Sequence, residues 1–198
     1  MELIYNKMNR NKKEKKSSVF FETIASVRRV VTVVQGGRIF SFSVLAIIGN
    51  KKGVYGIGQG KALDVTSAKR KAVAAARKNL VKVSLRSGRT VHHSVCGKFG
   101  ATEVIIRPAS PGTGVVAGGA VRALLEAIGV QDVVTKIIGS SNTHTALLAT
   151  TDALAKTHSL RAIAQLRSKT VKELVANIKN NKNVDEESAE KDDDEASA

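Results

Sequence analysis

The stretch from Gln35 to Ala76 restricts the fold of this chain more than any other part. Two adjacent glycines, Gly36 and Gly37, supply the positive φ angles that a tight chain reversal needs. Residues 28–34 before them are rich in β-branched side chains, and residues 39–48 after them alternate in polarity. One face of this second segment carries its apolar residues Phe40, Phe42, Val44 and Ala46. We therefore predict an antiparallel hairpin.

A third strand and a helix complete this unit. The turn Gly49–Gly53 carries two lysines and leads into a strand over residues 54–57. Three strands with one apolar face need a helix to cover that face, and the segment Asp64–Leu80 supplies one, with Asp64 as its N-cap. A narrow stripe of mostly small residues marks its buried side: Val65, Ala68, Ala72, Ala76 and Leu80. Helical spacing at Phe20, Ile24 and Val27 also predicts one or two helical turns before the sheet.

Basic residues gather on the opposite side of this helix. At about 100° per residue, that side holds Arg70, Lys71, Arg77, Lys78 and Lys82. Lys69 falls near the apolar stripe and must extend its charge out to water. Between Arg28 and Gly100 there are fifteen bases and one acid, whereas an ordinary solvated face mixes the two signs. This segregation indicates a surface that binds a polyanion.

The second half of the chain alternates strands with helices, which predicts an α/β domain. Strands are expected over residues 90–95, 104–106 and 133–138, with helices over residues 120–128 and 143–156. A glycine-rich loop covers Pro108–Gly119. The predicted divisions are a disordered basic arm (1–19), a first domain (20–83), a second domain (84–165), a helical extension (166–184) and a disordered acidic tail (185–198).

The net charge of +15 combines an acidic tail with a strongly basic body. Residues 185–198 hold eight acids and one base, so the rest of the chain carries 31 bases and nine acids, a net +22. Nucleic acid is the leading partner for such a body, and an anionic membrane surface is the weaker alternative. No apolar run approaches the roughly 20 residues that span a bilayer, no secretory signal is recognisable, and the single cysteine excludes an intramolecular disulfide.

Few residues suggest catalysis or metal binding. His92, His93 and Cys96 lack a second ligand pair, and Cys96 is interpreted as a small packing residue. A Ser-His-Asp catalytic site could be drawn from Ser140 or Ser141, His144 and Asp152, but the sequence around these serines is not that of a catalytic nucleophile. The run Gly56–Lys61 departs from the dinucleotide pattern, and we interpret it as a phosphate-binding loop at the start of the basic helix. We expect no cofactor, no metal and no enzyme activity.

One enzyme alternative stays open. The run Pro108–Ala117 resembles the phosphate loop of small-metabolite kinases of the galactokinase and homoserine kinase type. Its consecutive backbone amides could surround a phosphate group. The loop lacks the paired serines of that motif, and the body is unusually basic for such an enzyme.

Two resemblances bear on function. The run Lys61–Ala76 resembles the second helix of a double-stranded-RNA-binding domain, which reads A-form shape through phosphates and 2′-hydroxyls. A free-standing binder of double-stranded RNA is therefore a further alternative. The wider pattern spans five motifs in order: Gly36–Phe42, Gly56–Ala62, Arg107–Gly114, Ala117–Arg122 and Gly139–Asn142. Together these resemble the family of bacterial small-subunit ribosomal protein number five, over about residues 20–174.

The family resemblance implies a fold and a function. The fold is α+β: an αβββα N-terminal domain like double-stranded-RNA binders, then a C-terminal α/β domain of the type shared with small-metabolite kinases. The implied protein is a structural constituent of the cytoplasmic ribosome, not a homo-oligomer and not membrane-bound. It binds small-subunit ribosomal RNA between body and neck, touches small-subunit proteins four and eight, lies near the messenger RNA entry site, and contributes to subunit assembly and translational accuracy.

The residues expected to carry these contacts are mostly basic. The predicted RNA-binding set is Arg28, Arg29, Arg38, Lys51, Lys52, Lys61, Lys69, Arg70, Lys71, Lys78, Arg107 and Thr113. Arg122 is expected at the interface with protein four. The chain departs from the family pattern at Gln35, where many members carry a base, and at Thr145 and Leu148, where Asn and Arg are usual.

Overall fold

The computed structural model describes residues 20–171, 173 and 174. The predicted basic arm, the acidic tail and most of the predicted C-terminal extension lie outside these residues. Contacts group the chain into one compact unit up to Thr157 and a second from His158 onward, and each is described by itself. Within the described residues, no helix is long and apolar enough to cross a membrane.

The first sheet is antiparallel and has the order β1-β2-β3-β4. Its strands are β1 (Phe21–Val34), β2 (Gly37–Gly49), β3 (Val54–Ala62) and β4 (Leu80–Lys82). The predicted hairpin is confirmed: Val34 pairs with Gly37 across the turn. The helix predicted from Phe20, Ile24 and Val27 is wrong, because residues from Phe21 onward pair with β2 from Gly49 backward. Strand pairing at long range outweighs a weak local helical pattern.

Helix α2 (Val65–Lys78) covers one face of this sheet. Asp64 caps it as predicted, accepting hydrogen bonds from the amides of Thr66 (3.1 Å) and Ser67 (3.3 Å). The stripe residues Ala68, Ala72 and Ala76 are fully buried.

Glycines on β3 face this alanine stripe. A Cβ added to Gly58 would lie 2.2 Å from the carbonyl oxygen of Ala72, and one added to Gly60 would lie 2.4 Å from that of Ala68. The run Gly56–Lys61 is therefore part of a strand, and its interpretation as a phosphate-binding loop is wrong. Its glycines instead permit the close approach of α2 to the sheet.

The second sheet has the order β5-β6-β8-β7. Its strands are β5 (Val95–Phe99), β6 (Thr102–Pro108), β7 (Val115–Val116) and β8 (Val133–Gly139), with helices α3 (Gly119–Ile128) and α4 (Thr143–Ala155). The strand predicted over residues 90–95 is wrong, since Thr90 makes only an isolated bridge to Arg86 and the regular strand starts at Val95. A tight turn, held by hydrogen bonds between Arg86 and Thr90, occupies the start of the predicted segment, and regular pairing with β6 begins only afterwards.

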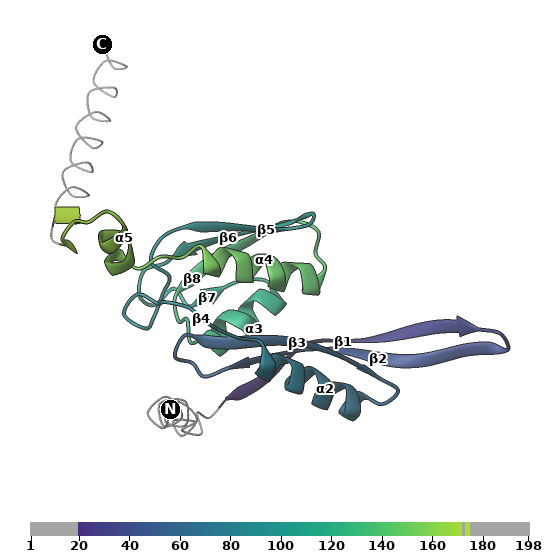
Figure 1. Ribbon diagram of the computed structural model, residues 1–198. Coiled ribbons are helices and arrows are strands. Elements are labelled where there is room, and N and C mark those ends of the chain that lie inside the picture. Colours follow the sequence, from purple (N-terminus) through teal and green to yellow (C-terminus); the bar gives the residue numbers. More distant parts are fainter. Residues whose placement is uncertain (1–19, 172, 175–198) are drawn as a thin grey trace, which may run out of the picture. The chain divides into compact units, whose positions relative to one another are not determined.

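Both helices of the second half lie between the two sheets. Helix α3 contacts β1 and β2 of the first sheet, while α4 packs on β5 and β6, and the two helices contact each other. Figure 1 shows α2 and α3 on opposite faces of the first sheet. Leu45 and Ile47 of β2 belong to the same buried cluster as Leu124 of α3 and Leu147 of α4. The two sheets therefore share a core, and the predicted boundary near Val83 stays a prediction.

The described residues beyond Thr157 include a short helix. Helix α5 (Leu160–Leu166) starts after Ser159, whose hydroxyl accepts a hydrogen bond from the amide of Ala162 at 3.2 Å.

Candidate nucleic-acid interface

The far end of the β1–β2 hairpin projects past both covering helices (Figure 1). We call residues 28–34 and 37–42 the distal hairpin. Its large apolar residues are strongly exposed, Val33 at 76% and Phe40 at 47%. With neither α2 nor α3 above them, these side chains are available to a partner.

Three of the arginines that are predicted to bind RNA lie on the distal hairpin, and they occupy both of its faces. Arg29 pairs with Phe42 and Arg38 pairs with Val33, which places these two arginines on one face. The guanidinium of Arg29 lies 4.8 Å from the ring centroid of Phe40. Arg28 lies on the other face, where its Nη2 donates to Oγ1 of Thr143 at 3.1 Å. The hairpin thus presents cations in two directions.

Helix α2 presents a second basic surface. Its predicted RNA-binding residues Lys69, Arg70, Lys71 and Lys78 are all exposed. The Nζ of Lys71 lies 3.5 Å from the carbonyl oxygen of Lys61 on β3. Lys61, which is also predicted to bind RNA, is therefore close to this helix. A groove of about 440 Å³ runs between the helix and β1, bordered by Glu22, Thr66, Lys69, Arg70, Val73, Ala74 and Arg77.

Arg77 belongs to this surface but was missing from the predicted set. It forms an ion pair with Glu22 of β1 at 2.9 Å, and both residues border the groove together with Lys69 and Arg70. Its position seven residues after Arg70, two helical turns on, was a usable signal.

Lys51 and Lys52 lie at the opposite end of β2 from the hairpin tip. The Nζ of Lys51 is 4.4 Å from the ring centroid of Phe21, and its amide donates to the carbonyl oxygen of Ala127 at 3.1 Å. The 13 residues of β2, at about 3.4 Å each, separate this turn from the tip by roughly 40 Å. The predicted RNA-binding residues therefore do not form one patch.

Arg107 and Thr113 belong to the second half of the chain. Arg107 is an exposed residue of β6. The Thr113 hydroxyl donates to the carbonyl oxygen of Ser110 at 2.9 Å within the glycine-rich loop. Arg122 lies on α3 and pairs with Glu126 at 2.8 Å, one helical turn away, with 58% of its side chain exposed.

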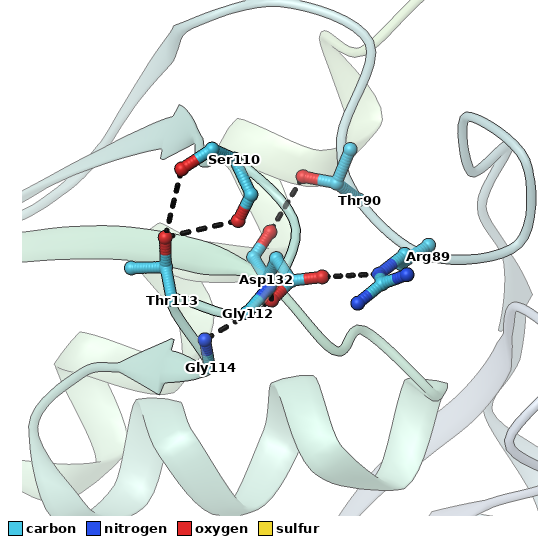
Figure 2. Close-up of polar contacts among 7 residues, drawn as sticks. All are labelled: Arg89, Thr90, Ser110, Gly112, Thr113, Gly114 and Asp132. Atoms are coloured by element: carbon cyan, nitrogen blue, oxygen red, sulfur yellow. Dashed lines mark hydrogen bonds and ion pairs between the residues drawn. The ribbon is translucent and has the colours of Figure 1, made fainter.

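The glycine-rich loop is held by a carboxylate that sequence analysis did not single out. The amides of Gly112 and Gly114 both donate to Oδ1 of Asp132 at 3.0 Å, and Nε of Arg89 donates to Oδ2 (Figure 2). The Arg89 hydrogen bond and then those of the glycine amides hold the pKa of Asp132 below its ordinary value. Two of the backbone amides that the kinase alternative would direct at a phosphate therefore already have an acceptor within the protein.

The other chemical candidates do not assemble. Among the described residues, no group of three or more His, Cys, Asp and Glu side chains could hold a metal ion. Asp152 accepts from Nζ of Lys156 at 2.6 Å and from the amide of Lys98 at 3.0 Å, and no hydrogen bond of the described residues joins it to His144. Cys96 is exposed rather than a packing residue, because it alternates on β5 with the buried Val95 and Gly97. Its thiol donates to Glu103 at 2.8 Å, which raises the pKa of the thiol.

The comparisons with known proteins agree with one another. The family model for Ribosomal protein S5, N-terminal domain, matches residues 20–84, and that for Ribosomal protein S5, C-terminal domain, matches residues 97–167. The Small ribosomal subunit protein uS5 of Ehrlichia ruminantium (strain Gardel) is 51% identical over 161 residues, which cover 81% of this chain and 92% of that protein. The chain belongs to the ribosomal protein S5 family.

Further relatives extend the same conclusion. The uS5 protein of Anaplasma phagocytophilum (strain HZ) is 52% identical over 154 residues, which cover 78% of this chain and 89% of that protein. The uS5 protein of Paramagnetospirillum magneticum (strain ATCC 700264 / AMB-1) is 47% identical over 163 residues, which cover 82% of this chain and 78% of that protein. Family membership confirms the resemblance, and the mixed α and β content agrees with the predicted class. It makes the chain an RNA-binding, non-enzymatic ribosomal protein of the cytoplasmic small subunit.

Proposed function

We propose that this protein binds small-subunit ribosomal RNA between body and neck through phosphate contacts from the distal hairpin and α2. One observation carries the proposal. Of the fifteen bases between Arg28 and Gly100, only Arg77 and Arg89 pair with an acid within the described part of the chain. The remaining positive charge needs an external counter-anion, and the RNA backbone supplies one at regular intervals.

The two basic surfaces have different roles in this proposal. Helix α2 gives a rigid row of cations of the kind that follows a duplex backbone without reading sequence. The distal hairpin reaches away from the rest of the protein and adds exposed apolar side chains, which can stack on bases or fill a shallow RNA groove. It is the element we assign to the neck, to the messenger entry region and to translational accuracy.

The salt dependence of binding tests the electrostatic part. Binding to small subunits stripped of their own copy should weaken with salt, with a slope of about −5 to −9 in log affinity against log salt if six to ten phosphates are engaged. Replacing Arg28, Arg29 and Arg38 together by Gln should reduce the magnitude of this slope by roughly 2 to 3. A flat salt response of the wild-type protein would reject the proposal.

A matched triple variant separates position from net charge. Lys98, Lys136 and Lys156 lie on β5, on β8 and just after α4, and their replacement by Gln removes the same charge. We expect a smaller change of slope for this variant. Equal effects from both triple variants would contradict the assignment of the distal hairpin, although not RNA binding itself.

Protein contacts complete the proposed function. We assign the exposed side chain of Arg122 to the interface with small-subunit protein four, and we propose small-subunit protein eight as a second protein neighbour. Cross-linking from position 122 in reconstituted subunits should recover protein four. Recovery of RNA alone would contradict this part. A free-standing binder of double-stranded RNA would instead bind generic duplexes and sediment apart from ribosomes.

A further inference from the structure

Asp132 is a buried acid that joins two segments far apart in sequence. Only 2% of the residue is exposed. Its carboxylate accepts from the amides of Gly112 and Gly114 and from Arg89, while its carbonyl oxygen accepts from the Thr90 hydroxyl at 2.6 Å. Figure 2 shows these donors converging on the one residue. The turn of residues 86–90 and the loop of residues 108–119 are therefore tied together through Asp132.

The loop has the form of an anion site. Gly112 and Gly114 have φ angles of 96° and 75°, a left-handed conformation that turns both amides toward the same point. In other proteins such converging amides hold a phosphate or another anion. Here the anion is a side chain of the chain itself, and Arg89 neutralises its second oxygen.

We propose that Asp132 is a positioning residue, a permanent internal anion that fixes the Pro108–Gly119 loop so that Thr113 of the loop is presented to ribosomal RNA together with Arg107 of β6. The last clause rests on the proposed function, whereas the anion role stands on the contacts alone. Asp132 touches no RNA in this account. It acts through the loop, which without an anion would have two converging amides and Arg89 without their acceptor.

Chemical rescue tests the anion role independently of RNA. Asp132→Ala removes the carboxylate and leaves a space beside the two amides, so the melting temperature should fall by about 5 to 10 °C. Sodium formate, a small carboxylate, should recover a large part of this loss, and sodium chloride at equal ionic strength should recover much less. Equal effects of the two salts, or a variant as stable as the wild type, would overturn the anion role.

Asp152→Ala is the matched control for that experiment. Asp152 also accepts one backbone amide and pairs with one base, but its side chain is 38% exposed and encloses no site. Formate should stabilise this variant no more than chloride does. A specific formate effect here as well would show general anion binding by a basic protein, and would also overturn the proposal.

The sign of the effect on RNA binding tests the positioning role. Removing an acid from a basic protein should strengthen binding to a polyanion by charge alone. We expect the reverse for Asp132→Ala: roughly tenfold weaker binding to stripped small subunits at a temperature well below its melting transition. Asp152→Ala should bind as the wild type or slightly more tightly. If Asp132→Ala does not fold, Asp132→Asn should bind about twofold to threefold more weakly than wild type.

The outcomes separate the two proposals. Failure of the wild-type protein to bind stripped subunits would reject the proposed function. Normal wild-type binding together with equal affinities of the Asp132 and Asp152 variants would reject the positioning role alone.

Discussion

The two ends of β2 lie in opposite environments. Near the β3 turn, residues 44–48 are buried on both faces, with α2 over one face and α3 over the other. Near the hairpin tip, Ile39 and Phe40 of the same strand are 48% and 47% exposed. The strand pairs regularly with β1 at both ends, while the covering helices decide which part stabilises the fold and which part remains for a partner.

The sharpest form of this comparison uses two isoleucines on the same face of β2. Ile47 is fully buried and Ile39 is about half exposed. Ile47→Ala should lower the free energy of unfolding by about 2 to 5 kcal/mol, because it leaves a cavity under α3. Ile39→Ala should change it by less than about 1 kcal/mol. Urea unfolding of both variants measures the difference. Equal losses of unfolding free energy would contradict the distinction between a buried end and an exposed end of β2.

Two glycines make a similar test with a smaller effect. Gly58 has no room for a Cβ, since Ala72 and Ala76 of α2 lie 2.2 to 2.3 Å from its place. Gly58→Ala should therefore cost about 1 to 3 kcal/mol by forcing α2 away from the sheet. Gly36 at the hairpin tip has open space around it but a φ of 100°.

The matched variant Gly36→Ala should cost about 1 to 2 kcal/mol through backbone strain alone. Thermal unfolding and the near-ultraviolet spectrum separate the two causes, because only Gly58→Ala should also disturb core packing. Disturbed core packing in Gly36→Ala would show that the hairpin tip affects the packing of the buried end of β2.

The smallest expected change in stability is at Arg29. Its contact with the Phe40 ring is exposed, so Arg29→Gln should cost no more than about 0.5 to 1 kcal/mol. Its binding to stripped small subunits should nevertheless weaken, with a salt slope smaller in magnitude by about 1. Arg29→Lys keeps the charge and should restore most of that slope. A large stability loss with unchanged binding would make Arg29 a structural residue instead.

Much of the fold and part of the site could be predicted from local patterns. The hairpin, the Asp64 cap, the alanine stripe of α2 and its basic face were each readable from spacing within one segment. The family resemblance rested on five short motifs in order, and family membership confirmed it. Whether each predicted base contacts RNA stays a prediction, although the structure shows that Lys51 and Lys52 lie apart from the distal hairpin.

The sequence by itself determined the local elements and the family, because caps, turns and helical stripes depend on residues a few positions apart. Only the tertiary structure decided which surfaces are buried. It made residues 21–27 a strand, covered Leu45 and Ile47 with a helix from some eighty residues later, and gave the Gly56–Gly60 run a packing role. It also brought the carboxylate of Asp132 to the amides of Gly112 and Gly114 in the loop of residues 108–119. Each of these outcomes depends on a partner distant in sequence, and no local pattern identifies that partner.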